Sequence, residues 1–409
     1  MHLLYNVGIY LYLLGIYIYS LFDPKAKLWI DGRKDIFNKI KATVNNEKIA
    51  WFHAASLGEF EQGRSVIEKF KEKHPDYKIL LTFFSPSGYE IRKNYEKADY
   101  IFYLPIDTPA NARHFIEIIK PNVVFFIKYE FWFNYLNELK KKDIPVFLIS
   151  GIFRPSQHFF KAYGNWFRKQ LNCFTYFFVQ NTISKDLLNS IGYNNIIISG
   201  DTRFDRVFAI ASQKKAFPII NSFKGGANKL ILAGSTWEPD EDLLFEFIKL
   251  KLKDIKYIIA PHETHPERII KLKEKLGSDV VLFSEANEEN VADAKILIVD
   301  GIGYLSHLYQ YADVSIIGGG FGKGIHNILE AATFGVPILF GPNYKKFSEA
   351  VELISLGGAF TINDKDEFLI KMKELIFNDA ERNNASLKCK NYVINKVGAT
   401  DIILENISF

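Results

Sequence analysis

Short apolar runs alternate with helix-like segments along nearly the whole chain, and this alternation constrains the fold most strongly. Strands that alternate with helices form a parallel sheet covered by helices on both faces. We expect a first series of strands at residues 49–54, 79–84, 100–104, 123–127, 146–149, 176–179 and 196–199. We expect a second series at residues 230–233, 257–260, 280–283, 296–299, 314–317 and 336–340.

Two series of strands in a chain of 409 residues predict an α/β protein with two domains. Two Rossmann-like units that face each other across a cleft fit this pattern, with ligands beyond the carboxyl ends of the strands. The expected order is an anchor helix at 1–22, a first domain at 23–206, a linker at 207–228, a second domain at 229–391 and a tail at 392–409. We expect the tail to form a helix that packs back on the first domain.

Residues 3–22 contain no charged side chain and are long enough to cross a bilayer as one helix. Lys25, Lys27, Arg33 and Lys34 follow this segment, so the positive-inside rule places the body of the protein in the cytoplasm. Asn6 and five tyrosines leave a second interpretation open, a helix that is buried or lies on the membrane surface. A cleaved signal peptide fits less well, because no basic segment precedes the apolar run.

The charge and cysteine content exclude several classes of function. Lys and Arg number 51 against 47 acidic residues, and a net charge of +4 does not indicate a nucleic-acid-binding protein. Cys173 and Cys389 lack the spacing of a metal site or disulfide framework. Residues 262–265 read HETH, but this is not the spacing of HExxH and Pro266 interrupts the helix. We therefore expect neither a metal nor a cofactor.

A glycine-rich stretch, GGGFGKGIHNILEAATFGVPILFGP, occupies residues 318–342. It predicts a strand, a loop, a helix and a further strand. Glycines let the backbone approach a ligand closely, and a helix start presents unpaired N–H groups, so the stretch predicts an anion site. The Glu330 carboxylate can accept hydrogen bonds from the hydroxyls of a ribose or another sugar. The alternative is a tight turn that Asn327 caps, with Glu330 in solvent.

Glu59 lies at the first strand-to-helix turn, where Gly58 loosens the backbone and the helix start favours a carboxylate. A carboxylate at the edge of a cleft can act as a general base toward a hydroxyl. The alternative is an ordinary acidic residue of a first helical turn. Glu61 competes for the role, although it points in a different direction.

Other polar residues follow predicted strands. Glu130 sits where acceptor contacts are expected, or acts as a cap or ion-pair partner. Arg203 can bind a carboxylate or phosphate with two N–H groups, or pair with Asp201 or Asp205. Ser235 and Thr236 can bind phosphate oxygens or cap a helix. His265 and Arg268 suit a nucleotide phosphate.

Taken together, these motifs resemble the 3-deoxy-D-manno-octulosonic acid (Kdo) transferases of lipopolysaccharide and lipid A biosynthesis. The resemblance is carried by the uncharged N-terminal segment, HAASLGEFEQG at 53–63, EFWFN at 130–134, SGDTRFD at 199–205, LAGSTWEPDE at 232–241, THPER at 264–268, the stretch 318–342 and FSEA at 347–350. These motifs cover nearly all of the chain in the family's order. Departures such as Arg203 in place of the usual lysine and SGIFR at 150–154 resemble a Bacteroidetes-like variant.

The resemblance implies a GT-B glycosyltransferase that transfers Kdo from CMP-Kdo to a lipid A precursor, lipid IVA, at the inner (cytoplasmic) membrane. It implies that Glu59 is the catalytic base, and we expect an inverting single displacement. The expected donor (CMP) contacts are Ser235, Thr236, His265, Arg268, Gly320, Gly322, Lys323, Gly324, His326, Asn327 and Glu330. The expected acceptor or Kdo contacts are Ser56, Gly58, Glu130 and Arg203.

Two other functions remain open from the sequence. One is a different GT-B enzyme, either a UDP-sugar transferase or a sugar-nucleotide epimerase. The other is a membrane-tethered sugar-nucleotide-binding protein without catalysis. A panel of donors separates the first from Kdo transfer, and binding without turnover would favour the second.

Overall fold

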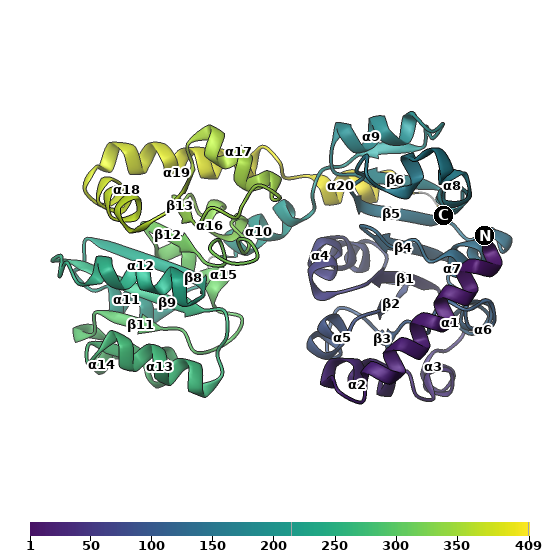
Figure 1. The fold of residues 1–409 in the computed structure, drawn as a ribbon, viewed down its shortest axis with the longest axis horizontal. Helices are drawn as coiled ribbons and strands as arrows, with labels where there is room; N and C mark the ends of the chain where they lie inside the picture. The colour runs from purple at the N-terminus through teal and green to yellow at the C-terminus, as the bar shows by residue number, and fades with distance from the viewer. Residues whose placement is uncertain (214, 408) are drawn as a thin grey trace. The chain divides into compact units, whose positions relative to one another are not determined.

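The computed structural model describes residues 1–213, 215–407 and 409. The chain divides into two compact units (Figure 1). Unit 1 comprises Met1–Arg206 and Gly398–Phe409, and unit 2 comprises Val207–Val397. Each unit contains one parallel seven-stranded sheet.

The sheet of unit 1 has the strand order β3-β2-β1-β4-β5-β6-β7, and all of its pairings are parallel. Its strands are β1 (Ile49–Ala54), β2 (Lys78–Phe83), β3 (Tyr100–Tyr103), β4 (Val123–Ile127), β5 (Val146–Gly151), β6 (Tyr176–Val179) and β7 (Ile196–Ile198). The strand order reverses between β1 and β4. In such sheets the carboxyl ends of the two strands at the reversal border a crevice that binds ligands.

Helices cover both faces of this sheet. One apolar layer includes Phe60, Phe70 and Ile403, from α4 (Leu57–Lys73) and α20 (Ala399–Glu405). The opposite layer includes Ile40, Phe115 and Leu136. The helices of unit 1 that remain are α2 (Pro24–Asp31), α3 (Ile36–Thr43), α5 (Pro86–Arg92), α6 (Pro109–Ile119), α7 (Phe133–Lys141), η1 (His158–Phe160), η2 (Ala162–Gly164), α8 (Asn165–Leu171) and α9 (Thr182–Asn189), besides α1.

The sheet of unit 2 has the order β10-β11-β9-β8-β12-β13-β14, again with parallel pairings. Its strands are β8 (Lys229–Thr236), β9 (Ile255–Pro261), β10 (Val280–Leu282), β11 (Ile296–Ile298), β12 (Val314–Ile317), β13 (Ile338–Phe340) and β14 (Ala359–Thr361). The order reverses between β8 and β12. The sequence missed β14, whose three residues give almost no periodic signal.

An apolar core between this sheet and its helices includes Phe247, Leu272 and Phe368. The helices of unit 2 are α11 (Pro218–Lys224), α12 (Glu238–Ile248), α13 (Pro266–Leu276), η3 (Phe283–Glu285), α14 (Glu288–Asp293), α15 (Leu305–Leu308), η4 (Tyr309–Tyr311), α16 (Leu329–Ala332), α17 (Ser348–Leu356), α18 (Lys365–Phe377) and α19 (Asp379–Ile394). Helix α10 (Arg203–Ser212) begins in unit 1 and ends in unit 2.

The segment that we expected to be a linker, 207–228, is largely helical in the part that the structure describes, which leaves out residue 214. It contains the end of α10 and the whole of α11, where Ile220 and Phe223 are fully buried. The proline and glycines that suggested a linker start and end α11 instead, since Pro218 is its first residue and Gly225 follows it with a φ of 48°. The C-terminal segment from Gly398 belongs to unit 1.

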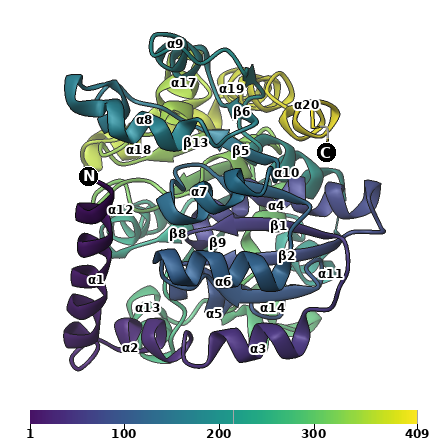
Figure 2. The ribbon, with the colours of Figure 1, turned by 90° about the vertical axis from the view of Figure 1, so that its right-hand side faces the viewer.

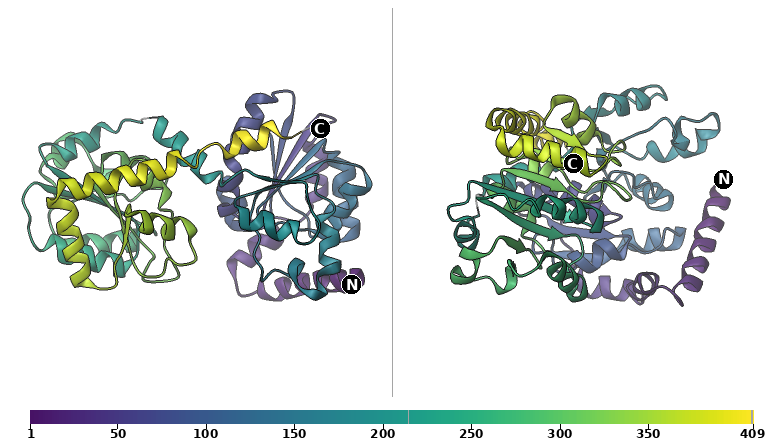
Figure 3. Two further views of the ribbon diagram at one scale, coloured as in Figure 1. Left: turned by 90° about the horizontal axis from the view of Figure 1, so that it is seen from above. Right: turned by 60° about the vertical axis from the view of Figure 1, so that its left-hand side comes forward.

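Helix α1 (His2–Tyr19) is long and apolar enough to cross a membrane, with a mean hydropathy of 1.3 and no buried residue. It is the one helix in the described chain with these properties. Figures 2 and 3 show α1 at the edge of unit 1, where it leads into α2. Such a helix fits a membrane anchor, as the sequence predicted.

Candidate active site

In unit 1, the predicted residues gather at the point where the strand order reverses. Glu59 follows β1 in the first turn of α4, and Glu130 follows β4. Because β1 and β4 pair in parallel, their carboxyl ends lie side by side. The topology therefore brings these two carboxylates to the crevice where a ligand is expected.

Glu59 is held by the turn in which it lies. The amide and the hydroxyl of Ser56 both donate to Glu59 Oε2, at 3.0 Å each. Oε1 accepts no hydrogen bond from the described chain. Burial raises the pKa of Glu59 above its ordinary value, and the Glu130 carboxylate raises it further, whereas Ser56 and Lys128 oppose the shift. One carboxylate oxygen is thus fixed, and the other is available to accept a proton.

The competing acid, Glu61, points elsewhere, as we expected. Its carboxylate pairs with Arg92 at 2.7 Å and with Arg64 at 3.6 Å. Gly58 differs from expectation, because it adopts ordinary helical geometry within α4 without a positive φ. A Cβ added at Gly58 would meet no atom within 4 Å. The turn itself therefore does not require a glycine there.

Glu130 ends a buried chain of polar side chains that starts in the sheet. Trp51 Nε1 donates to Thr82 Oγ1, and Thr82 Oγ1 lies 2.8 Å from Nδ1 of the fully buried His53. When the Thr82 hydroxyl donates to Nδ1, His53 Nε2 carries the proton and donates to Glu130 Oε2 at 3.2 Å. Trp132 Nε1 donates to the same oxygen at 2.6 Å. Glu130 is thus fixed by the side chains of His53 and Trp132, rather than acting as a helix cap.

The strand ends beside these carboxylates are strained. Lys128 follows β4 with a φ of 70°, and Ser150 in β5 has a φ of 53°. Non-glycine residues rarely adopt this geometry, and it gathers at functional sites. Burial lowers the pKa of Lys128, and Arg203 lowers it further, while Glu59 acts in the opposite direction. Sequence reasoning assigned no role to Lys128, because backbone strain leaves no mark on composition or spacing.

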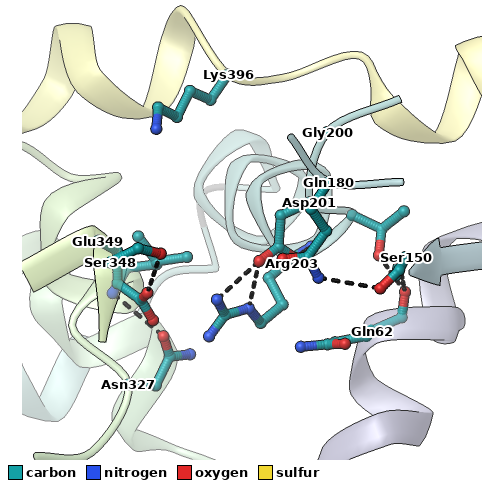
Figure 4. A network of polar contacts seen from close by, with 12 residues as sticks. Gln62, Ser150, Gln180, Gly200, Asp201, Arg203, Asn327, Ser348, Glu349 and Lys396 are labelled. Atoms are coloured by element: carbon teal, nitrogen blue, oxygen red, sulfur yellow. Dashed lines mark hydrogen bonds and ion pairs between the residues drawn. The ribbon is translucent and has the colours of Figure 1, made fainter. Parts of the chain in front are cut away.

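A second polar group surrounds the end of β5. Ser150 Oγ lies 2.8 Å from Thr202 Oγ1, and Gln180 Nε2 donates to the Ser150 carbonyl at 3.1 Å (Figure 4). The Thr202 hydroxyl donates to the carbonyl of Gln62, whose side-chain oxygen is buried without a partner in the described chain. Gln62 lies in α4, three residues after Glu59. It is a further candidate contact that the sequence did not single out.

Arg203 pairs with Asp201, which was one of the expected alternatives. Arg203 Nε and Nη2 lie 2.9 and 2.7 Å from Asp201 Oδ2 (Figure 4). The other candidate partner, Asp205, instead accepts from the amides of Gly398 and Thr400, at 2.6 Å each. Asp205 therefore secures the C-terminal segment, whereas the Arg203–Asp201 pair stays at the strand ends.

In unit 2, the glycine-rich loop follows β12 at the reversal between β8 and β12. Several glycines are required by close backbone approach. A Cβ at Gly320 would lie 2.5 Å from the amide nitrogen of Gly341, and one at Gly319 would lie 2.5 Å from the carbonyl oxygen of Gly324. Asp240 Oδ2 accepts from the amide of Gly319 at 3.1 Å and from that of Trp237 at 2.9 Å. The loop is therefore tied to the start of α12.

The loop presents unpaired amides. The N–H groups of Gly320, Phe321 and Lys323 have no acceptor in the described chain. Neighbouring unpaired amides in a glycine-rich turn, here Gly320 and Phe321, can form a concave site for an anion. The helix that follows is shorter than the sequence suggested, since α16 has only four residues. The predicted anion site would therefore depend on the loop amides and not on the dipole of a long helix.

Asn327 and Glu330 interact with each other as well as with the turn. Asn327 Oδ1 accepts from the amide of Leu329 at 3.2 Å, and Asn327 Nδ2 donates to Glu330 Oε1 at 3.1 Å. Asn327 thus accepts from the first amide of α16, although the N-cap residue of this helix is Ile328. Lys323 and Gly322 are exposed on the loop.

The donor contacts expected at the starts of α12 and α13 differ in how available their side chains are to a ligand. Ser235 is strained, with a φ of 52°, and is half-buried. Thr236 is buried, and its hydroxyl donates to Glu241 Oε1 at 2.8 Å. Arg268 forms an ion pair with Glu241, and both side chains are largely buried. Thr236 and Arg268 are therefore held by an internal carboxylate that was absent from the predicted site. His265 caps α13, with Nδ1 accepting from the amide of Arg268 at 3.3 Å.

His326 lies in an aromatic stack. Its ring stacks on His262 with centroids 4.2 Å apart, and Trp237 Nε1 donates to His326 Nε2 at 3.0 Å. Burial, and to a smaller extent the neighbouring His262, lower the pKa of His326 to about 4. His326 is therefore neutral at pH 7. Because Nε2 accepts from Trp237, Nδ1 carries the proton and can donate to a ligand, but the ring adds no positive charge.

The chain is similar to known proteins over most of its length. Residues 32–206 match the family described as 3-deoxy-D-manno-octulosonic-acid transferase (kdotransferase). The 3-deoxy-D-manno-octulosonic acid transferase of Aquifex aeolicus is 27% identical over 347 residues, which cover 82% of this chain and 88% of that protein. The corresponding transferase of Rickettsia bellii is 27% identical over 395 residues, covering 94% and 92%.

A solved UDP-GlcNAc 2-epimerase from Neisseria meningitidis has the same overall fold, with a TM-score of 0.61 and 17% sequence identity, over 88% of this chain and 98% of that one. This likeness supports the predicted GT-B architecture of two parallel α/β sheets. This chain covers most of the length of both sequence relatives. Residues 32–206 thus match the Kdo transferase family, and the chain is similar to whole Kdo transferases over most of its length.

Proposed function

We propose that this glycosyltransferase moves Kdo from CMP-Kdo to the primary hydroxyl of the glucosamine disaccharide of a lipid A precursor such as lipid IVA. The observation that carries the proposal is the pair Glu59 and Glu130 at the strand reversal of unit 1. One oxygen of Glu59 is fixed by Ser56, and the other is unpaired in the described chain. A fixed carboxylate with a raised pKa has the properties of a general base.

In the proposed step, Glu59 Oε1 takes the proton of the acceptor hydroxyl while that oxygen attacks the anomeric carbon of Kdo. The new glycosidic bond forms as the bond between the anomeric carbon and the phosphate oxygen breaks. CMP leaves with the electron pair of that bond, so the configuration at the anomeric carbon inverts. Glu130, held by His53 and Trp132, and the Arg203–Asp201 pair line the acceptor side.

The donor's phosphate is assigned to the loop of unit 2. The unpaired amides of Gly320, Phe321 and Lys323 are suited to stabilise the charge that develops on the departing phosphate. Ser235 and the neutral His326 add hydrogen-bonding groups, Gly322 and Gly324 keep the loop open, and Lys323 supplies charge. Thr236, His265, Arg268, Asn327 and Glu330 support this site or contact the nucleotide.

The acceptor is a lipid, so we place the enzyme at the inner (cytoplasmic) membrane with both units in the cytoplasm. Helix α1 provides the membrane contact, and the lysines after it favour the anionic inner surface. Holding the enzyme at the membrane raises the concentration of acceptor that the site encounters.

The test is an incubation of the purified protein with a tetraacylated lipid A precursor and one donor at a time. CMP-Kdo generated in situ is compared with UDP-GlcNAc, and mass spectrometry of the lipid counts added sugars. The proposal predicts one or more Kdo additions with the CMP donor only. A sugar added from UDP-GlcNAc, or its epimerisation without acceptor, would assign a different GT-B activity. Binding of CMP without turnover of the lipid would contradict catalysis.

A further inference from the structure

Helix α1 contacts unit 1 along one stripe only. Its half-buried residues are Tyr5, Asn6, Ile9, Leu13 and Ile16, at the three- and four-residue intervals of a single helix face. Residues Ile9, Leu13 and Ile16 pack against an apolar cluster formed by Trp29, Ile30 and Ile106. The face of α1 toward unit 1 is therefore occupied by protein along most of its length.

Polar contacts fasten the first turn of α1. The Tyr5 hydroxyl donates to Asp107 Oδ2 at 2.6 Å, and Asn134 Nδ2 donates to Asn6 Oδ1 at 3.0 Å. His2 Nε2 lies 3.3 Å from Asn134 Oδ1. We call these contacts among His2, Tyr5, Asn6, Asp107 and Asn134 the latch. His2, Tyr5 and Asn6 of the latch lie on α1, and such polar side chains are unusual in a membrane-spanning helix.

The receiving side of the latch is built into the domain. Asp107 is only 1% exposed, and its carboxylate also accepts from the amides of Asn134 and Tyr135, at 3.1 and 3.0 Å. These amides belong to the first turn of α7, so Asp107 caps that helix and binds Tyr5 at once. Release of α1 would leave a buried carboxylate oxygen without its hydroxyl donor, which is unfavourable.

A cavity of about 430 Å³ lies behind the second half of α1. Leu13 and Tyr17 of α1 form one side, and Trp29, Ile30 and Phe37 form part of the other. Arg33 also lines it and donates to the carbonyls of Trp29, Phe84 and Leu104. If α1 left unit 1, these apolar side chains would be exposed. The helix therefore completes the surface of the domain.

The outer face of α1 is apolar and uncovered. Leu3, Leu4, Leu11, Leu14 and Ile18 are all more than half exposed, and no charged side chain occurs before Asp23. Exposed Lys25, Lys27, Lys34 and Lys39 follow in α2 and around α3. An apolar helix face beside lysines matches the boundary between headgroups and acyl chains of an anionic bilayer.

A crossing helix and a latched helix exclude each other. Helix α1 has 18 residues, which gives a length of about 27 Å, and a bilayer core is about 30 Å thick. A crossing would place Tyr5 and Asn6 in or near hydrocarbon and remove the inner stripe from its apolar cluster. We propose that α1 stays latched and lies along the surface of an anionic lipid bilayer, with its outer face among the headgroups, instead of crossing it. This inference rests on the proposed function only because the lipid acceptor places the protein at a membrane. It does not depend on the transfer reaction.

Label depth in a bilayer tests the inference directly. Full-length protein with Cys173→Ser would carry one spin label at Leu3→Cys, Leu11→Cys or Ile18→Cys, and bind vesicles of phosphatidylcholine and phosphatidylglycerol. We expect all three labels at one shallow depth. A crossing helix would instead place the label at Leu11→Cys about 10–12 Å deeper than the other two, from a rise of about 1.5 Å per residue, and would overturn the inference. A label at Ile370→Cys, exposed on unit 2, sets the value for water.

The latch itself is tested by hydrogen exchange of residues 1–20. We expect Tyr5→Phe to speed exchange in α1 by roughly 10- to 100-fold, the worth of one hydrogen bond to a carboxylate. Tyr10→Phe is the matched control, because Tyr10 is 55% exposed on the outer face. Equal exchange in both variants would overturn the latch. Failure to bind vesicles would also overturn the inference, whereas Kdo transfer to a detergent-dispersed acceptor separately decides the proposed function.

Discussion

The two units have parallel seven-stranded sheets of different strand order, and their candidate sites are of two different kinds. In both, the candidate residues follow the two strands at which the order reverses, β1 and β4 in unit 1 and β8 and β12 in unit 2. Unit 1 builds its site from side chains, with Glu59 and Glu130 as the central groups. Unit 2 builds its site from backbone, with glycines that pack closely and amides that remain unpaired.

This difference matches the chemistry proposed for each unit. A proton must be taken by a side chain whose pKa can be adjusted, and burial beside Glu130 adjusts Glu59. A phosphate is bound well by amides that need no charge of their own. The neutral His326 and the internally paired Arg268 fit a donor site that depends little on cations.

The largest effect is expected from Glu59→Gln. The amide keeps the size of the side chain but cannot take the acceptor's proton, so the rate of transfer should fall by roughly 10²- to 10⁴-fold. Glu61→Gln is the matched control, because Glu61 pairs with Arg92 and Arg64 away from Glu59. Steady-state transfer assays compare the two variants. Equal losses in both would remove the distinction between these acids.

Gly320→Ala should damage unit 2 without touching unit 1. The new Cβ would lie 2.5 Å from the amide nitrogen of Gly341, so the loop must move, at a cost of roughly 1–3 kcal/mol. Gly322→Ala is the control, since its Cβ would meet only the Gly319 carbonyl oxygen at 3.6 Å. Urea unfolding measures the difference. Equal stability of the two variants would contradict the close packing of the loop.

His53→Ala tests how unit 1 holds Glu130. The change removes one buried partner from Glu130 and one from Thr82, and we expect it to lower the free energy of unfolding by roughly 1–3 kcal/mol. It should also reduce transfer, because Trp132 then holds Glu130 without His53. The exposed His158 provides the control variant, His158→Ala. Wild-type stability and transfer in His53→Ala would show that this chain of side chains has no positioning role.

The pH profile tests the coupling between the two carboxylates. Glu59 must be ionised to act as a base, so transfer should fall as the pH drops through its raised pKa. Replacing Glu130 with glutamine removes one cause of that raised pKa. The acidic limb of the kcat/KM profile of Glu130→Gln should therefore move to lower pH, even if the maximum value of kcat/KM changes. A limb that stays in place or moves upward would contradict the coupling.

The smallest effect is expected from Gly58→Ala. Gly58 is helical, and its Cβ would meet open space, so alanine should stabilise unit 1 by about 0.5–1 kcal/mol. Thermal unfolding measures this gain, and transfer should be unchanged. A gain in stability with a loss of transfer would show instead that the acceptor fills the space beside Gly58.

Most of the fold was predictable because buried parallel strands leave strong apolar runs in the sequence. Thirteen of the fourteen strands were expected at nearly their observed positions. The short β14 was missed, and the segment 207–228 was interpreted as a linker. In that segment Pro218 starts a helix and Gly225 follows its end. Sequence spacing alone cannot separate helix caps from a linker.

Only those site residues that belong to sequence motifs could be predicted. Glu59, Glu130 and the glycine loop follow strands and could be found from their spacing. Lys128 and Ser150 are marked by backbone strain, and Asp240 and His53 by buried hydrogen bonds across distant segments. The internal partners of Thr236 and Arg268 were hidden for the same reason, since Glu241 meets them only in three dimensions.

The two proposed roles are proton removal by unit 1 and donor binding by unit 2. They are tested most directly by measuring CMP affinity and single-turnover Kdo transfer on the same preparations of Glu59→Gln and Gly320→Ala. Glu59→Gln is expected to bind CMP like the wild type and to transfer Kdo roughly 10²- to 10⁴-fold more slowly. Gly320→Ala is expected to bind CMP weakly and to transfer Kdo once the donor saturates it. Wild-type transfer by Glu59→Gln, or an equal loss of CMP affinity in both variants, would contradict these two roles.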